Sequence, residues 1–315
     1  MRSADTILSL RDVSVRFPAE GGKSVKALTE VSLDIRKGEV FGLVGESGSG
    51  KTTLGKAILR LVDTHQGQIE FDGQDITHLN TAELRPLRKR MQVIFQDPFG
   101  SLNPRMSVES ILSEAAGLVE SNGHLSTRVD ELLDLVGLPV TSRKRYPHEF
   151  SGGQRQRICV ARALAVRPDF IVADEPVAAL DVSIQAQIVN LLQDLQQELG
   201  LTMLFIAHDL AVVRHISDRI GVMYLGRMQE VGPSEAIVAD ARHPYSKALL
   251  SAVPVPDPQA QTRRQILEGE LPSPIDPPSG CVFRTRCPLA DPACANEIPL
   301  LKDISGGRHV ACLKL

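Results

Sequence analysis

Residues 45–52 constrain the fold of this 315-residue chain more than any other segment. Their sequence, Gly-Glu-Ser-Gly-Ser-Gly-Lys-Thr, fits the pattern G-x-x-x-x-G-K-[ST]. In such a loop the glycines let backbone N–H groups turn inward around phosphate oxygens, the lysine contacts the β- and γ-phosphates, and the threonine hydroxyl ligates Mg²⁺. An apolar strand over 40–44 precedes the motif and a helix is predicted over 51–61. This context favours a phosphate site at a helix N-terminus over a plain glycine turn.

Two carboxylates follow a second apolar strand. Asp174 and Glu175 come directly after Phe170-Ile-Val-Ala. Ligands of open α/β sheets bind at the carboxyl ends of the strands. Alone, two acids after a strand are more often a solvated loop. Beside a phosphate loop we expect Asp174 to hold Mg²⁺ and Glu175 to polarise an attacking water.

A second small-residue segment, Ser151-Gly-Gly-Gln154, begins a helix predicted to run through 165. Small residues at a helix start can form an anion cradle, although serine is also an ordinary helix cap. The chain then has two phosphate cradles and one loop lysine. This arrangement suggests that each nucleotide is shared between two subunits.

Strands alternate with helices along much of the chain. Strand patterns occur over 6–17 and 31–35, and buried strands over 170–173 and 202–207 flank an amphipathic helix over 184–199. Between 100 and 165 the pattern is mainly helical. The predicted fold class is α/β with a mostly parallel sheet.

In this order the motifs resemble those of ATP-binding-cassette (ABC) ATPases, over about residues 5–250. Gln96 resembles the family's coupling glutamine, and His208 the histidine that contacts the γ-phosphate. Ala179-Leu-Asp181 resembles the loop that contacts the opposite subunit, and Phe17 stands where an aromatic ring meets adenine. Ala178 departs from the serine of many relatives, with a minor effect expected. The resemblance implies a P-loop NTPase cassette with an N-terminal antiparallel β subdomain and a helical subdomain at about 97–168.

The resemblance also implies a set of site residues. The catalytic residues would be Glu175, His208, Gln96 and Lys51, and Mg²⁺ would bind at Thr52, Gln96 and Asp174. The residues implied to bind ATP are Phe17, Gly45, Ser47, Gly48, Ser49, Gly50, Lys51, Thr52, Thr53, Ser151, Gly152, Gly153, Gln154 and Asp181.

Three further segments resemble the oligopeptide/dipeptide importer subfamily: 97–105, 243–245 and 269–281. This resemblance implies a peripheral ATPase at the cytoplasmic face of the inner membrane. Its partners would be a second, identical or different, ABC ATPase, two permease subunits and, indirectly, an extracytoplasmic solute-binding protein. The expected solutes are di- or oligopeptides. Nickel, glutathione and opine-type solutes are the alternatives within the same subfamily.

The C-terminal region is rich in proline and then in cysteine. Seven prolines lie between 254 and 278, and four cysteines follow with the spacing C-x5-C-x6-C-x17-C. We therefore expect an ABC ATPase domain over 1–250, a Pro-rich linker over 251–280 and a cysteine-rich extension over 281–315. The paired C-x2–4-C spacing of zinc sites is absent. A [4Fe–4S] cluster on Cys281, Cys287, Cys294 and Cys312 is the favoured interpretation, with zinc or free thiols as alternatives. Cys159, in an apolar helix, is expected to be a packed small hydrophobe.

Charge and composition give several other functions no support. The net charge of −3 gives no basic surplus for nucleic-acid binding. No stretch has the length of a membrane span, and an acid at position 5 argues against a signal peptide. Other hypotheses are a soluble cassette of translation or DNA repair, a redox-regulated module, and a small-molecule kinase. The first usually has two cassettes or coiled-coil insertions, and a kinase would leave the Ser-Gly-Gly-Gln segment without a role.

Overall fold

The computed structural model describes residues 5–121, 123–252, 265 and 267–315, which form two compact units. Unit 1 combines residues 1–78 with 206–315, and unit 2 is residues 79–205. The C-terminal extension therefore groups with the N-terminal part of the chain. Within the predicted Pro-rich linker, residues 253–264 and 266 lie outside the described residues.

Unit 1 contains an antiparallel sheet with the strand order β2-β1-β4-β5. Its strands are β1 (Thr6–Pro18), β2 (Ser24–Arg36), β4 (Gln66–Phe71) and β5 (Gln74–Asp75). Strand β2 begins well before the predicted 31–35 segment, because residues from Ser24 onward pair with the end of β1, where Phe17 faces Val25. The short turn η1 (Glu20–Gly22) closes this hairpin. The pairing adds strand that apolar alternation alone did not reveal.

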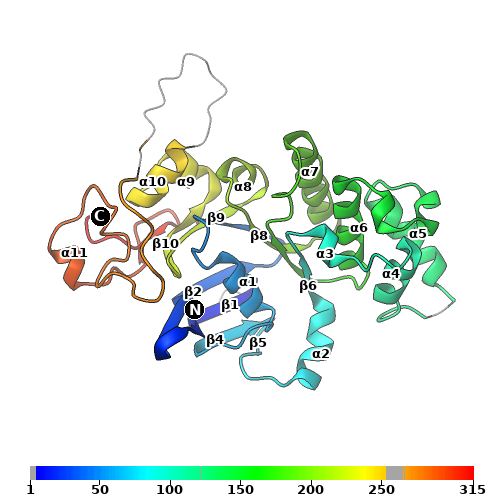
Figure 1. The fold of residues 1–315 in the computed structure, drawn as a ribbon, viewed down its shortest axis with the longest axis horizontal. Coiled ribbons are helices and arrows are strands. Elements are labelled where there is room, and N and C mark those ends of the chain that lie inside the picture. The colour runs from blue at the N-terminus through cyan, green and yellow to red at the C-terminus, as the bar shows by residue number, and fades with distance from the viewer. Residues whose placement is uncertain (1–4, 122, 253–264, 266) are drawn as a thin grey trace, which may run out of the picture. The chain divides into compact units, whose positions relative to one another are not determined.

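A second set of strands in unit 1 is ordered β11-β12-β10-β9-β3. These strands are β3 (Val40–Val44), β9 (Arg219–Tyr224), β10 (Arg227–Pro233), β11 (Lys302–Asp303) and β12 (His309–Val310). Strand β3 is entirely buried and runs parallel to β9. Strand β12 of the extension pairs with β10 through Glu230 and Val310. The extension thus continues a sheet of unit 1 (Figure 1).

The helices of unit 1 are short. They are α1 (Lys51–Ile58), α8 (Leu210–Ile216), α9 (Ser234–Ala239), α10 (Pro244–Ser251) and α11 (Ala293–Asn296). Helix α1 starts where predicted and ends before the predicted residue 61. It ends early because Arg60 adopts a left-handed backbone conformation with φ of 52°.

Unit 2 has three strands in the order β8-β7-β6, and β6 runs parallel to β7. The strands are β6 (Met91–Ile94), β7 (Phe170–Asp174) and β8 (Thr202–Ile206), the last residue of which belongs to unit 1. The helices are α2 (Thr81–Arg90), α3 (Pro98–Ser101), α4 (Val108–Ala116), α5 (Leu125–Leu135), α6 (Gly152–Leu164) and α7 (Val182–Leu199), with the 3₁₀ turns η2 (Val140–Lys144) and η3 (Pro147–Glu149). The mainly helical pattern predicted between 100 and 165 is confirmed by α4, α5 and α6, and the helix predicted over 184–199 is confirmed as α7. Helices α4, α5 and α6 pack on one another.

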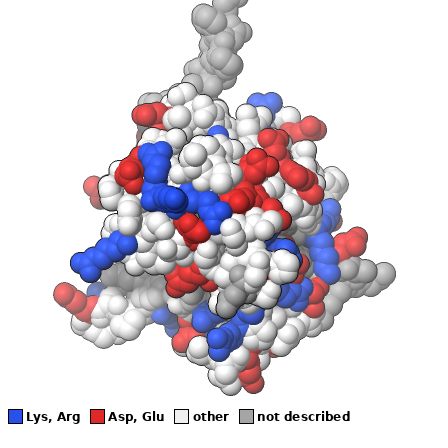
Figure 2. Space-filling model, turned by 90° about the vertical axis from the view of Figure 1, so that its right-hand side faces the viewer, with Lys and Arg blue, Asp and Glu red and all other residues white. Residues whose placement is uncertain are grey.

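The surface of unit 2 carries both signs of charge. Figure 2 shows basic and acidic side chains interleaved with uncharged ones, and neither sign covers the face. Arg143, for example, pairs with both Glu109 and Asp130. In the described part of the chain, no helix is long and apolar enough to cross a membrane.

Candidate nucleotide site

The loop over 45–50 owes its shape to glycine. Gly48 and Gly50 have φ of 78° and 103°, a region that glycine adopts most readily. A Cβ on Gly50 would lie 2.5 Å from the Ala27 carbonyl oxygen, and one on Gly45 would lie 2.2 Å from that of Met223. The loop is therefore seated tightly against strands β2 and β9.

Helix α1 begins at the end of this loop. Its N-cap is Gly50, and no side chain among the described residues caps it. The first N–H groups of an uncapped helix can donate to a ligand, and the helix dipole favours an anion there. Lys51 is only 4% exposed and donates from Nζ to the carbonyl oxygens of Gly45 and Glu46, at 2.7 and 3.0 Å. A buried ammonium at an uncapped helix start fits a phosphate group.

Unit 1 also positions two of the other predicted residues. Phe17 lies at the end of β1 and is 38% exposed, so its ring is accessible for stacking. His208 is exposed and lies two positions after Ile206, the last residue of β8. Asp209, the next residue, caps α8 by accepting from the Ala211 N–H. The cap fixes where the backbone turns after His208.

Unit 2 places Gln96 and Glu175 at one edge of its sheet. Ile94 of β6 is paired with Ala173 of β7, so both residues follow that pair by two positions. Asp174 is the last, buried residue of β7. Glu175 has a φ of 47°, which is costly for a residue with a side chain. Strain of this kind is characteristic of functional sites.

The Ser151-Gly-Gly-Gln154 segment starts α6 with a capping box. The Ser151 hydroxyl accepts from the Gln154 N–H, and the Gln154 side chain accepts from the Ser151 N–H. A Cβ on Gly153 would lie 2.5 Å from Cγ2 of Ile184 in α7. Asp181, the exposed N-cap residue of α7, precedes Ile184 by three positions. Unit 2 thus brings the 151–154 segment close to the loop at 179–181, which was predicted to contact the opposite subunit.

The four C-terminal cysteines share one neighbourhood. The Cys281 N–H donates to the Cys294 carbonyl oxygen at 2.8 Å. Burial raises the pKa of the Cys281 thiol, and the thiols of Cys287, Cys294 and Cys312 raise it further. As they stand, however, the described residues include no group of three or more His, Cys, Asp or Glu that could hold a metal ion. Cys159 is 1% exposed and burial raises its pKa to about 11, so the expectation of a packed small hydrophobe is confirmed.

The extension also contacts the phosphate loop, which sequence reasoning missed. Arg286 forms a two-pronged ion pair with Glu46, at 2.6 Å from Nη1 and 3.1 Å from Nη2. The Glu46 N–H donates to the Tyr245 hydroxyl at 2.8 Å. Arg286 is 240 positions from Glu46, and no local pattern signals such a pair.

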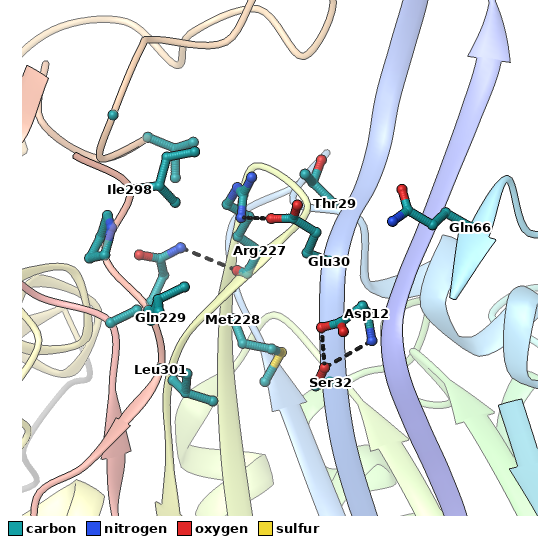
Figure 3. A pocket seen from close by; sticks show the side chains of 15 residues that line it. Asp12, Thr29, Glu30, Ser32, Gln66, Arg227, Met228, Gln229, Ile298 and Leu301 are labelled. Carbon is teal, nitrogen blue, oxygen red and sulfur yellow. Dashed lines mark hydrogen bonds and ion pairs between the residues drawn. The ribbon is translucent and has the colours of Figure 1, made fainter. Parts of the chain in front are cut away.

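A pocket of about 450 Å³ lies elsewhere in unit 1. Figure 3 shows polar pairs among its lining residues: Arg227 with Glu30, Gln229 with the Arg227 carbonyl oxygen, and Ser32 with Asp12. Apolar residues 298–301 also line the pocket. None of the predicted nucleotide-site residues lines this pocket, so it is a separate cavity.

Comparison with known proteins gives the chain its family. Residues 28–178 match the ABC transporter family model, and residues 229–294 match the oligopeptide/dipeptide transporter C-terminal region. The oligopeptide transport ATP-binding protein AppF of Bacillus subtilis is 51% identical, covering 98% of this chain and 97% of its own length. The oligopeptide transport ATP-binding protein OppF of Salmonella typhimurium is 50% identical, covering 98% of this chain and 96% of its own length. A Brucella ovis chain, whose name provisionally assigns it to peptide import, is 56% identical over 98% of both.

Solved structures agree with this family. The ATP-binding cassette MJ0796, in a dimeric post-hydrolysis state bound to ADP and phosphate, is 29% identical with a TM-score of 0.66, over 72% of this chain and 99% of that one. CbiO1 of Clostridium perfringens, part of the ABC transporter complex cbiONQ, is 29% identical with a TM-score of 0.68. The match covers 75% of this chain and 92% of that one. The chain belongs to the ABC transporter ATPases. Its C-terminal region is that of the oligopeptide/dipeptide branch, and both the predicted family and the predicted α/β cassette fold are confirmed.

Proposed function

We propose that this chain is the ATP-hydrolysing subunit of an importer for di- or oligopeptides. The observation that carries the proposal is full-length similarity, at about half of all positions, to proteins named for oligopeptide transport, together with the matching C-terminal region. The phosphate loop at an uncapped helix N-terminus supports the ATP-binding half of the proposal.

Most of the binding role falls to residues of unit 1. Backbone N–H groups of residues 45–52 and the Lys51 ammonium bind the β- and γ-phosphates, and Phe17 stacks on adenine. Ser47, Ser49 and Thr53 complete the loop around the phosphates. Thr52, Gln96 and Asp174 would hold Mg²⁺, which would neutralise charge on the phosphate oxygens when bound.

The chemical role falls to Glu175 and His208. The Glu175 carboxylate orients and polarises the attacking water, and His208 contacts the γ-phosphate. Catalysis is then positioning plus charge stabilisation, as in other phosphoryl transfers. The left-handed backbone of Glu175 supports a role that fixes its carboxylate.

The second cradle acts on the nucleotide of another subunit. Ser151, Gly152, Gly153 and Gln154, with Asp181, contact the ATP held by a partner cassette of identical or different sequence. Closure of the two cassettes on each other encloses two ATP molecules, and ATP hydrolysis reopens the dimer. The dimeric state named for MJ0796 supports this arrangement.

The partners in the membrane are two permease subunits, fed by an extracytoplasmic solute-binding protein. The chain would sit peripherally at the cytoplasmic face, and residues 96–114 would transmit the closure. Phe99, at the start of α3, supports this role because it is a large apolar side chain left 65% exposed.

The four C-terminal cysteines are proposed to bind a [4Fe–4S] cluster. Their number and common neighbourhood support it, since four thiolates hold such a cluster. Binding would have to draw the thiols together from their present positions. Anaerobic protein should then contain about four irons per chain and absorb broadly near 400 nm. Replacing any one of the four by serine should remove both signals and Cys159→Ser neither, whereas stoichiometric zinc or no metal would refute the cluster.

Peptide uptake tests the transport proposal. A strain lacking this chain should fail to grow on dipeptides as its amino-acid source, and the wild-type chain should restore growth. The Glu175→Gln variant should not restore it. Undiminished growth on peptides without the chain, together with loss of uptake of nickel, glutathione or an opine, would assign the solute to that alternative.

A further inference from the structure

We infer that Arg286 of the C-terminal extension is a positioning residue of the phosphate loop, which neutralises and fixes the Glu46 carboxylate so that the loop accepts an anionic nucleotide. The inference rests on the proposed nucleotide site. It adds to that site a residue from outside the matched ATPase segment, contributed by the cysteine-rich region.

The geometry of the Arg286–Glu46 pair is bidentate. Nη1 and Nη2 of the guanidinium each donate to one carboxylate oxygen of Glu46, the arrangement that gives arginine–carboxylate pairs their strength and direction. The Arg286 side chain is 9% exposed, against 30% for Glu46. The paired carboxylate raises the pKa of Arg286, so its positive charge is permanent. A charged pair sheltered to this extent is screened less by salt than a surface pair.

The position of Glu46 explains why the loop needs a cation. Glu46 is the second residue of the phosphate loop, and its own carbonyl oxygen already accepts from Lys51. An uncompensated carboxylate there would repel the triphosphate and compete for Lys51. Arg286 removes that charge from the loop, and the bond from the Glu46 N–H to Tyr245 fixes the backbone beside it.

Arg286 is held in place by buried aromatic packing. Phe283 is fully buried, and its carbonyl oxygen accepts from the Arg286 N–H at 3.0 Å. The Phe283 ring lies 5.2 Å from the ring of Tyr224 and 5.3 Å from that of Tyr245. The backbone that carries Arg286 is therefore anchored by the buried Phe283, and the ion pair with Glu46 links the extension directly to the phosphate loop.

A plain structural tether makes a different prediction from a charge-compensating residue. Breaking a tether from either end costs the same contact, so Arg286→Ala and Glu46→Gln would have equal effects. If Arg286 compensates charge, the two ends are unequal. Loss of arginine leaves an anion in the loop, while loss of the carboxylate leaves a cation that favours ATP.

The experiment measures ATP affinity, KM and kcat of the full-length chain with Arg286→Ala, Glu46→Gln and the double variant. Arg286→Ala should weaken ATP binding about tenfold, the scale of one uncompensated charge near a protein surface. Glu46→Gln should bind ATP as well as wild type or better, and the double variant should recover wild-type affinity within about threefold. The loss should appear in KM with kcat retained, and it should shrink as salt is raised.

Arg284→Ala is the matched control. Arg284 lies two residues away in the same segment and donates to Ser279 rather than to the loop. It should leave ATP affinity unchanged. Equal losses from Arg286→Ala and Glu46→Gln, or a double variant as weak as Arg286→Ala, would overturn the inference.

Two further variants keep the result interpretable. If Arg286→Ala does not fold, Glu46→Gln with the extension intact still decides the matter, because weakened ATP binding in that variant contradicts charge compensation. Lys51→Ala tests the underlying site. Retained ATP affinity in Lys51→Ala would refute the proposed phosphate loop itself, a failure distinct from that of Arg286.

Discussion

The two glycine-rich segments of this chain use glycine for different physical reasons. In the loop over 45–50, Gly48 and Gly50 supply backbone angles that other residues rarely adopt, and distant residues hold the loop in place. In the segment over 151–154, the glycines are helical, and Gly153 is required because Ile184 leaves no room for a Cβ. The first segment has a left-handed backbone at two glycines, whereas the second is a regular helix start with an ordinary cap.

The contrast extends to the proposed roles. The loop belongs to unit 1 and binds the chain's own nucleotide, while the 151–154 segment and Glu175 belong to unit 2. Binding and chemistry should therefore separate under mutation.

The largest separation is expected for Glu175→Gln. The change keeps the side-chain shape and removes the charge that orients water, so hydrolysis should fall by about 10²-fold or more. ATP should still bind, because the loop of unit 1 is untouched. Steady-state turnover and nucleotide binding on the same preparation measure the two effects. Near-normal turnover would remove Glu175 from the chemistry.

The packing around the loop predicts a pH-dependent stability. Burial lowers the pKa of His243 from 6.5 to about 4. Its Nδ1 accepts from the Tyr245 N–H at 3.1 Å, and its backbone N–H donates to Glu230. Between pH 6.5 and about pH 4, His243 is protonated in the unfolded chain but stays neutral in the folded chain. The contribution of His243 is thus complete above pH 6.5 and is lost as the pH falls toward 4, by about 3 kcal/mol.

His243→Asn isolates that contribution. Asparagine also caps a helix start, so α10 keeps its N-cap, but it does not titrate. Urea unfolding of both proteins from pH 7 to 4 should show a shallower decline for the variant. Parallel curves would mean that His243 takes up its proton normally in the folded chain.

Gly153→Ala tests the spatial requirement in unit 2. The added methyl group would meet Ile184 at 2.5 Å, and relieving that overlap should cost about 1–3 kcal/mol of unfolding free energy. The second change Ile184→Ala should recover much of the loss when the two are combined. Destabilisation that persists fully in the double variant would show that the methyl group meets something else.

Gly48→Ala is the counterpart in unit 1 and should have the smallest effect. In the described part of the chain nothing lies within 4 Å of a Cβ at this position, so only the left-handed backbone resists the change. The expected cost is about 1 kcal/mol, measured by the same urea unfolding. A loss larger than that of Gly153→Ala would reverse the comparison.

The sequence predicted those parts of the site whose chemistry is local. The strand over 40–44, the start of α1 at Lys51, the Ser151 cap and the position of Asp174 all follow from contiguous residues, and the structure confirms these elements. The extent of β2 could not be predicted in this way, because its first residues are specified by pairing with β1. Arg286 was missed because its partner Glu46 is distant in sequence, so no local pattern signals the pair.

The roles of the two segments can be separated in a dimer assembled from two differently tagged copies of this chain, both carrying Glu175→Gln to retain ATP. In one arrangement Lys51→Ala is in one copy and Gly153→Asp in the other; in the second, both changes are in the same copy. The two dimers contain the same substitutions, so stability effects are matched. ATP retained per closed dimer is the measurement. If each site combines the loop of one copy with the 151–154 segment of the other, the first arrangement retains one ATP and the second none, and the opposite result would contradict the account.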